Sequence, residues 1–226
     1  MKIKVSELFY SLQGEGRFVG VPSVFLRTYG CNFTCAGFGC KPGEKSTGAD
    51  EVAKVVDQYK DFLSLPLVET GCDSYASWHP AFKHLSPTYT AEELVEKITA
   101  LLPHQHWLQP NGNPVHLVIT GGEPLLDPNN KKILQHLRDI GRLSEVTLTY
   151  NTNGTVQPVQ EWIDLWAKAE WVRLHFSLDG TGSTFEYTRY PANWNQVQEN
   201  IQWFRQIQGP CILTEVNAIV GIHNVF

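Results

Sequence analysis

Long hydrophobic runs are missing from this sequence. No stretch of 18 consecutive apolar residues occurs, which excludes a simple membrane-spanning helix. Residues 1–16 lack a long apolar segment and a cleavage site, so no signal peptide is expected. The formal net charge is −5, from 18 basic and 23 acidic residues, which gives no general reason to expect a nucleic-acid partner. These absences predict a cytoplasmic location, with no membrane and no direct nucleic-acid contact.

Cysteine is also scarce, with five residues in the chain. Because this is an odd number and no export signal is expected, the cysteines argue against a disulfide framework and for a metal or redox site. Cys31 and Cys35 lie just beyond the apolar run 24–26, which reads as a buried strand that ends at Gly30. Thiolates on a loop at the end of a strand can hold a metal ion or an iron–sulfur cluster.

The spacing of the cysteines bears on which metal they bind. A closed structural zinc site needs four Cys or His ligands, usually in two close pairs. Cys31 and Cys35 form one loose pair, whereas Cys40 and Cys72 are single, and no histidine lies near them at pair spacing. A 4Fe–4S cluster that is held by three cysteines and leaves one iron open to an organic ligand fits better. Cys211 falls in a predicted strand and is expected to belong to the core, because free cysteines are commonly buried.

Strands, polar or glycine-rich loops and helices alternate along most of the chain. Apolar segments predict strands at 21–29, 115–120, 146–150, 171–178 and 212–220. Capping patterns predict helices that begin after Thr90, Asp127 and Asn193, and apolar periodicity predicts a further helix around 159–166. This order is typical of an α/β fold with a parallel sheet and right-handed crossovers, here curled into a partial (βα) barrel.

The ends of the predicted strands carry the polar residues of interest. In a barrel of this kind, functional groups gather at the carboxyl ends of the strands. Cys31, Gly121, Asn153 and Asp179 each fall at such an end. We therefore expect these four residues on one rim, and a sheet with no function there would have no reason to collect them.

The length of the chain suits a single domain, so residues 1–226 are expected to form one core domain. Residues 36–89 do not continue the pattern of strands and helices and are rich in Gly, Pro and Ser. We interpret them as an insertion after the first strand. Within it, residues 51–63 have the apolar periodicity of one helix.

Two features near the amino terminus each allow two interpretations. Residues 13–16 read Gln-Gly-Glu-Gly, and their glycines could let the backbone approach a ligand or could form an ordinary hairpin turn. Arg27 stands in an otherwise apolar run, four residues before Cys31. An inward-facing arginine needs an anionic partner, whereas one at a sheet edge could point to solvent.

The Cys31-x3-Cys35 pair after a predicted strand, with Gly-Gly-Glu-Pro at 121–124 after the next, resembles the radical S-adenosylmethionine (SAM) superfamily. The resemblance implies a 4Fe–4S cluster on three cysteines, with SAM chelating the open iron through its amino and carboxylate groups. It implies that the Gly-Gly-Glu turn contacts the SAM amino group. It also implies an enzyme without a catalytic side chain, because one electron cleaves SAM to the 5′-deoxyadenosyl radical that reacts.

Within the superfamily, residues 11–31 resemble the 7-carboxy-7-deazaguanine synthase family. In that family the third cluster cysteine follows the second by three residues, but position 38 here is Phe. Cys72 opens the sequence Cys-Asp-Ser-Tyr-Ala-Ser-Trp, which has the family's ending, whereas Cys40 precedes Lys-Pro-Gly. The resemblance therefore implies that residues 36–71 interrupt the motif and that Cys31, Cys35 and Cys72 hold the cluster. Cys40 stays open as the alternative third ligand.

The synthase resemblance implies a lyase of queuosine and 7-deazaguanine formation, which converts 6-carboxy-5,6,7,8-tetrahydropterin to 7-carboxy-7-deazaguanine and ammonia. It implies substrate contacts from Leu12, Gln13, Gly14, Thr120 and Arg27, the last on the carboxylate, and a Mg²⁺ ligand in Ser74. It implies SAM contacts from Gly71, Asp73, Gly121, Gly122, Glu123 and Ser177, with Asn153 and Asp179 either on the ribose or engaged in turn and cap chemistry. It also implies an electron donor such as flavodoxin or ferredoxin, and it leaves a homodimer as one possible assembly.

The carboxyl-terminal third departs from the synthase pattern. Residues 175–191 look more like radical enzymes that act on peptides, and Ser177 is followed by Leu-Asp where the family has Pro-Lys. Two other functions therefore stay open. One is an activase that installs a glycyl radical on a partner, or another peptide-modifying radical enzyme. The other is a non-catalytic metal-binding module, in which Gly-Gly-Glu-Pro is only a turn.

Overall fold

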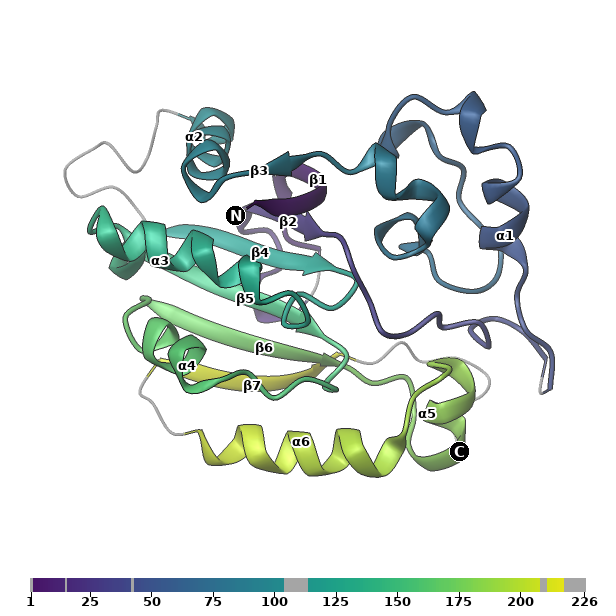
Figure 1. Ribbon diagram of the computed structural model, residues 1–226. Helices are drawn as coiled ribbons and strands as arrows, with labels where there is room; N and C mark the ends of the chain where they lie inside the picture. Colours follow the sequence, from purple (N-terminus) through teal and green to yellow (C-terminus); the bar gives the residue numbers. More distant parts are fainter. Residues whose placement is uncertain (1, 15, 42, 104–113, 208–210, 218–226) are drawn as a thin grey trace.

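The chain folds around one seven-stranded sheet, seen in a computed structural model that describes residues 2–14, 16–41, 43–103, 114–207 and 211–217 (Figure 1). The strand order is β3-β1-β2-β4-β5-β6-β7. Strands β2 and β4 to β7 run parallel, and β1 pairs antiparallel with both β2 and β3. The strands are β1 (Ile3–Leu12), β2 (Pro22–Thr28), β3 (Thr88–Tyr89), β4 (Val115–Gly121), β5 (Val146–Thr152), β6 (Trp171–Ser177) and β7 (Ile212–Asn217).

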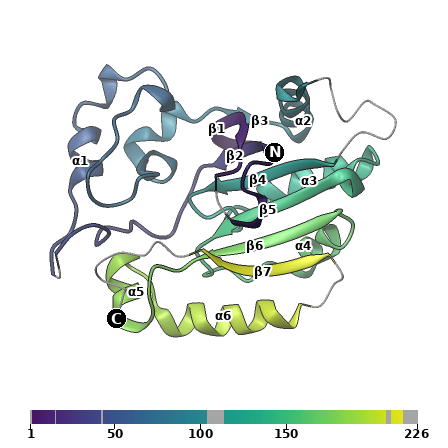
Figure 2. The ribbon, with the colours of Figure 1, turned by 180° about the vertical axis from the view of Figure 1, so that it is seen from behind.

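Four helices pack on one side of this sheet, as the two opposite views in Figures 1 and 2 show. They are α2 (Ala91–Leu101), α3 (Lys132–Asp139), α4 (Gln160–Trp166) and α6 (Trp194–Gln206). The helix α5 (Gly182–Thr188) lies beyond the carboxyl ends of the strands, and α1 (Gly48–Ala53) lies in a separate lobe. Short 3₁₀ turns occur at Gly16–Phe18, Val56–Gln58, Phe62–Ser64, Tyr75–Ser77, Pro80–Leu85, Pro128–Lys131 and Leu143–Glu145. None of the described helices has the length and apolar character needed to cross a membrane.

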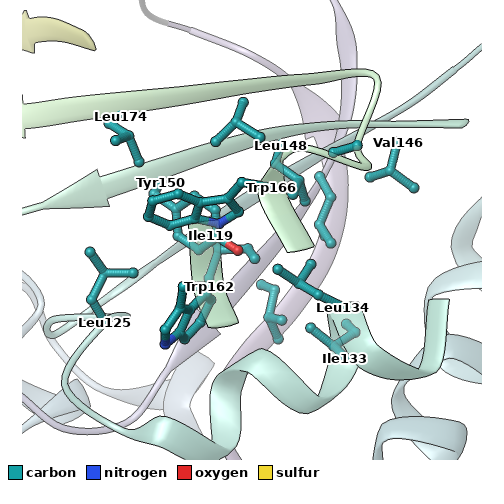
Figure 3. Packing of buried hydrophobic residues seen from close by; sticks show 14 of the residues in the cluster. Ile119, Leu125, Ile133, Leu134, Val146, Leu148, Tyr150, Trp162, Trp166 and Leu174 are labelled. Carbon is teal, nitrogen blue, oxygen red and sulfur yellow. The ribbon is translucent and has the colours of Figure 1, made fainter. Parts of the chain in front are cut away.

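The main core lies between the sheet and these helices. Figure 3 shows Tyr150 of β5 beside Trp162 and Trp166 of α4, with ring centroids 5.9 and 5.5 Å from the tyrosine ring. Alternate residues of the strands enter this core, because successive side chains of a strand point to opposite faces. The other face of β4, β5 and β6 is also buried but polar, with His116, Thr149, Arg173 and His175 on it.

The expected parallel α/β sheet is confirmed, and so are the helix starts after Thr90 and Asn193. Asp127 is an N-cap as predicted, but it caps the 3₁₀ turn Pro128–Lys131, and the α-helix α3 begins only at Lys132. Thr90 and Glu93 form a reciprocal capping box at α2, and the Asn193 side chain accepts a hydrogen bond from Gln196 N at the start of α6. The strand expected first is instead the second, because Ile3–Leu12 forms a ten-residue strand before it. Residues 218–220 of the last predicted strand lie outside the described residues.

A small lobe is built between β2 and β3, around the buried residues Tyr75, Ala76 and Phe82. The helix predicted over 51–63 is wrong, because α1 ends at Ala53 and separate 3₁₀ turns follow. Asp61 caps a new turn by accepting from Ser64 N at 2.9 Å, while Ser64 Oγ interacts in return with the backbone of Asp61. A side chain that caps a helical start competes with a continuous helix through the same residues.

Candidate active site

Three cysteines from two separate segments of the chain line one cavity of about 200 Å³ at the carboxyl ends of the strands. Cys31 and Cys35 lie on the loop after β2, and Cys72 comes from the lobe. Cys35 is buried and has a positive φ of 49°, which is uncommon for a residue with a side chain. The loop therefore adopts an uncommon backbone conformation at Cys35, and it presents Cys31 and Cys35 to the cavity that Cys72 also lines.

The three thiols influence one another's ionisation. Burial raises the pKa of Cys31 to about 12. A hydrogen bond between the thiols of Cys35 and Cys72 raises the pKa of Cys35 and lowers that of Cys72. Buried thiols of this kind become good ligands when a metal cation replaces their protons.

The donor set fits an iron–sulfur cluster better than a single ion. Within the described part of the chain, no group of three His, Cys, Asp or Glu side chains is placed to hold one metal ion. Backbone N–H of Phe33 and the Asn153 amide both point at Cys31 Sγ, at 3.4 and 3.9 Å. Hydrogen bonds to the sulfurs of this type are a regular feature of iron–sulfur sites.

Cys40 lies outside this arrangement. Its thiol is buried and donates toward the carbonyl oxygens of Ala36 and Phe38, at 3.5 and 3.8 Å. It does not line the cavity that the other three cysteines share. Cys211 does not lie inside a strand as predicted, because β7 begins at Ile212. It is half-buried, and its thiol lies 3.7 Å from Trp166 O, so it packs beside α4.

The Gly-Gly-Glu turn after β4 is packed against the loop after β2 that carries Cys31 and Cys35, called the cysteine loop below. A Cβ atom on Gly121 would lie 2.2 Å from Thr28 O, and one on Gly122 would lie 2.0 Å from Gly30 O. Glu123 N donates to Gly30 O at 2.7 Å. Only glycine permits backbones to approach this closely, so the turn fixes where the cysteine loop begins.

The Glu123 carboxylate does not line the cavity. It is buried and accepts from Thr152 Oγ1 at 3.0 Å, from Asn153 N at 2.7 Å and from Leu125 N at 3.1 Å. Burial raises the pKa of Glu123 to about 7. In this structure the side chain ties the turn after β4 to the end of β5, and the expected SAM contact would have to come from the turn's backbone.

Polar residues at the ends of β4, β5 and β6 complete the cavity. Those expected from the sequence to bind SAM, substrate or, for Ser74, Mg²⁺ and found on its wall are Gly71, Asp73, Ser74, Thr120, Gly121, Gly122, Asn153, Ser177 and Asp179. Asn153 also closes a local turn, because its Oδ1 accepts from Thr155 N at 3.0 Å. Both interpretations of Asn153 thus have a basis in its geometry.

Arg27 finds its anionic partner within the protein. Its Nε donates to Glu7 Oε2 at 3.0 Å, and its Nη1 donates to Ser74 Oγ at 2.8 Å. Ser74 Oγ in turn donates to Asp73 Oδ1 at 3.1 Å. Arg27 therefore reaches the cavity only through Ser74 and does not line it.

The structure does not bring residues 12–14 to the cavity. They begin the loop of the β1–β2 hairpin, in which Gln13 N donates to Val21 O and Gly20 N donates to Gln13 O. Leu12 and Gly14 are exposed, whereas Gln13 is buried. The hairpin interpretation of this glycine-containing segment thus has a direct basis, and its contact with a ligand stays a prediction.

Sequence reasoning missed Arg189, which lines the cavity beside Asp179 and Cys35. Its Nη1 lies 3.9 Å from Cys35 Sγ, and its Nη2 pairs with Asp179 Oδ2. Arg189 and Cys35 are separated by 154 positions in the chain. An unusual arginine in the segment 175–191 is visible in the sequence, but no local pattern points to its partner.

Comparison with known proteins gives one family match and several relatives. The sequence model of the radical SAM superfamily matches residues 70–225. A 7-carboxy-7-deazaguanine synthase of Halobacterium salinarum is 30% identical over 155 residues, which are 68% of this chain and 40% of that protein. Another of Methanopyrus kandleri is 33% identical over 62% of this chain and 45% of its own length.

A short stretch is much more similar to a further relative. The 7-carboxy-7-deazaguanine synthase of Rhodospirillum rubrum is 66% identical over 32 residues, 14% of each chain. Among solved structures, QueE from Escherichia coli gives a TM-score of 0.46 at 17% identity, over 96% of this chain and 85% of that one. A structural likeness at this level is too weak to decide function. The chain spans about two fifths of the length of the first curated relatives that it matches.

Proposed function

The chain belongs to the radical SAM superfamily, and on this premise we propose that it is a 7-carboxy-7-deazaguanine synthase. It would convert 6-carboxy-5,6,7,8-tetrahydropterin to 7-carboxy-7-deazaguanine and release ammonia. The observation that carries the proposal is one cavity lined by three cysteines, by the Gly-Gly turn at the end of β4 and by Ser177 at the end of β6. The relatives that bear this name support the same assignment.

The proposed cofactors are a 4Fe–4S cluster, SAM and Mg²⁺, the first two being those of the superfamily. Cys31, Cys35 and Cys72 would hold the cluster, and when bound the cluster and SAM supply the one-electron chemistry of the reaction. The protein's task is to position the groups. Asn153 and Phe33 N orient Cys31, and Gly122 lets the turn approach the cysteine loop.

The residues around SAM are proposed to be the polar wall of the cavity, namely Gly71, Asp73, Gly121, Gly122, Asn153, Ser177 and Asp179, with Glu123 acting through its turn. The buried Glu123 carboxylate holds Asn153 N and Thr152 Oγ1, so it fixes two of these loops relative to each other. Rigid positioning of this kind lowers the entropic cost of reaching a reactive geometry.

The substrate is proposed to lie between the cavity and the β1–β2 hairpin. Thr120 lines the cavity, and Arg27 is positioned by its hydrogen bonds to Glu7 and Ser74. A guanidinium fork suits the substrate carboxylate, which would compete with Glu7 for it. Ser74 Oγ has oxygen lone pairs for Mg²⁺, which prefers oxygen ligands. Leu12, Gln13 and Gly14 would contact the pterin edge after the hairpin moves toward the cavity.

The proposal extends to the setting of the reaction. An electron donor of the flavodoxin or ferredoxin type would reduce the cluster in the cytoplasm, and two copies of the chain could form a homodimer. Residues 1–226 would act as one core domain with 36–89 as its insertion. The segment 175–191, which suggested a peptide substrate, contacts the loop of Cys31 and Cys35 through Tyr190 O, and the peptide-modifying alternative stays a prediction.

Anaerobic reconstitution tests the proposal. The protein should take up about four irons and four sulfides per chain, as three thiolate ligands imply. Incubation with dithionite, SAM and the carboxypterin should then give 5′-deoxyadenosine and 7-carboxy-7-deazaguanine, both followed by mass spectrometry. Stoichiometric zinc without nucleoside product would refute the enzyme, and SAM cleavage that ignores the carboxypterin would refute the substrate.

A further inference from the structure

The loop that carries Cys31 and Cys35 is held by the end of α5 and by the residues that follow it. The carbonyl oxygen of Tyr190 accepts hydrogen bonds from Thr34 N at 2.9 Å and from Cys35 N at 3.0 Å. A Cβ atom on Gly37 would lie 2.1 Å from Tyr187 O, so the two backbones touch. Figures 1 and 2 both show α5 beside the chain that leads from β2 to the lobe. The position of Cys35 therefore depends on residues 187–190.

The same segment brings one cation to the thiols. Arg189 is the single lysine or arginine among the described residues that line the cavity, whereas Asp73 and Asp179 are its carboxylates. Its guanidinium lies between the Cys35 thiol and the Asp179 carboxylate, with Nη1 at 3.9 Å from Cys35 Sγ and Nη2 paired with Asp179 Oδ2. The side chains of Arg189 and Asp179 are 19% and 4% exposed, so solvent screens this pair weakly.

One N–H donor of the Arg189 guanidinium makes no hydrogen bond with the described residues. Its Nε is buried and has no hydrogen-bond partner within the described residues. A buried donor that is left unpaired is costly and is retained where a structure needs the group for another purpose.

We propose that Arg189 and Asp179 together set the reduction potential of the cluster on Cys31, Cys35 and Cys72. The inference rests on the proposed function, because it presupposes that cluster. One electron enters the cluster from the external donor, and the net negative charge at the cysteines increases by one. The Arg189 cation stabilises that added charge and favours the reduced form, while Asp179 opposes it and holds the cation in place.

Arg189 is thus a positioning residue that acts through the cysteine sulfur. Its effect is opposite in sign to that of Asp179, although the two side chains touch. A purely structural pair would behave differently, because removal of either partner would damage the same contact in the same direction. The signs therefore separate the electrostatic role from a structural one.

The test is a redox titration of the reconstituted full-length protein without SAM, followed by electron paramagnetic resonance. At the potential where the wild-type cluster is half reduced, Arg189→Gln should lower the ratio of reduced to oxidised cluster about tenfold, a midpoint shift of about −59 mV for one electron. Asp179→Asn should raise the ratio. Arg189→Lys, which keeps the charge, should stay within about threefold of wild type. Arg205→Gln, an exposed arginine of α6, is the charge-matched control.

Each outcome decides the question. Opposite shifts in the Arg189→Gln and Asp179→Asn proteins support the proposal. Equal potentials in all variants, or shifts of the same sign, overturn it. If the Arg189→Gln and Asp179→Asn proteins fail to load iron, the Arg189→Lys protein decides. An Arg189→Lys protein that loads the cluster and has the wild-type potential supports the electrostatic role of Arg189. An Arg189→Lys protein that fails to load iron overturns that role. A wild-type protein that takes up no cluster contradicts the proposed function itself.

Discussion

Arg27 and Glu7 face each other across β2 and β1, with Arg27 Nε 3.0 Å from Glu7 Oε2. Both side chains are mostly buried, at 22% and 16% exposed. The cross-strand register creates this pair, and the second contact of Arg27, to Ser74 Oγ, joins the sheet to the lobe. An arginine that serves two partners at once is sensitive to the shape of its donor group as well as to its charge.

Arg27→Lys tests this shape. Lysine keeps the charge next to Glu7 but cannot span Glu7 and Ser74 with one planar fork. We expect carboxypterin turnover to fall at least about tenfold, which corresponds to about 1.4 kcal/mol of transition-state binding. Slow, uncoupled SAM cleavage should persist, because the cysteines are unchanged. Arg138→Lys, an exposed substitution on α3, is the control. Unchanged turnover in the Arg27→Lys protein would argue against a carboxylate clamp.

The third cluster ligand is tested by two alanine substitutions. Cys72→Ala should lose the cluster, because Cys72 lines the cavity with Cys31 and Cys35. Cys40→Ala should keep it, because the Cys40 thiol points at the carbonyl oxygens of Ala36 and Phe38. Iron and sulfide content and the visible absorption spectrum measure the difference. The reverse result would assign the ligand to Cys40 and remove the basis for the roles of Asp73 and Ser74.

The buried His116 should make the protein less stable in mild acid. Its Nδ1 lies 2.6 Å from Ser23 Oγ and its Nε2 lies 2.8 Å from Thr149 Oγ1. Burial, with Arg173 and His175 nearby, lowers the pKa of His116 to about 4. The unfolded chain binds a proton near pH 6.5, so the stability from the neutral ring is complete above about pH 6.5 and is lost as the pH falls toward 4.

Urea unfolding of the metal-free protein measures this effect. Between pH 7.5 and 5 the contribution of His116 should fall by about 2 kcal/mol. His116→Gln keeps a polar side chain without the titration, so its unfolding free energy should change less over the same range. His84→Gln, at an exposed position, should behave like wild type. A variant at 116 with the full wild-type pH dependence would show that another group is responsible.

Gly122→Ala tests the contact between the turn after β4 and the cysteine loop. The added Cβ would lie 2.0 Å from Gly30 O and 2.7 Å from Cys31 Cβ, so backbone must move. We expect a loss of about 1–3 kcal/mol in unfolding free energy, typical of overpacking, together with reduced iron uptake. Gly14→Ala is the matched control, because nothing lies within 4 Å of a Cβ there. Equal stability of the two variants would contradict the tight packing.

Local patterns predicted most of the fold. Strand and helix positions after residue 89 follow from apolar periodicity and from caps at Thr90 and Asn193, which depend on neighbours a few positions away. The helix predicted over 51–63 is wrong because α1 ends at Ala53 and the Asp61 cap starts a separate turn later in the periodic segment. A prediction from apolar periodicity alone does not take account of a capping residue inside the periodic segment.

The site was predictable only in part, for a related reason. The ends of parallel strands meet at one edge of the sheet, so Gly121, Asn153 and Asp179 could be placed on one wall. The partner of Arg27 depends on the register of β1 against β2, and that of Arg189 depends on a contact across 154 positions. Sequence spacing carries no information about either pairing. The direction of the Glu123 side chain likewise depends on the loop after β5.

The lobe around Tyr75 and Phe82 lies between Cys35 and Cys72 in the chain and brings Cys72 to the cavity. In the proposed holoenzyme, bonds from iron to Cys35 and Cys72 would cross-link the two ends of the segment that forms the lobe, much as a disulfide closes a loop. Such a cross-link removes chain entropy from the opened state. Iron supply would then affect the lifetime of the protein as well as its activity, because a metal-free form without this cross-link would open the lobe to proteases more often.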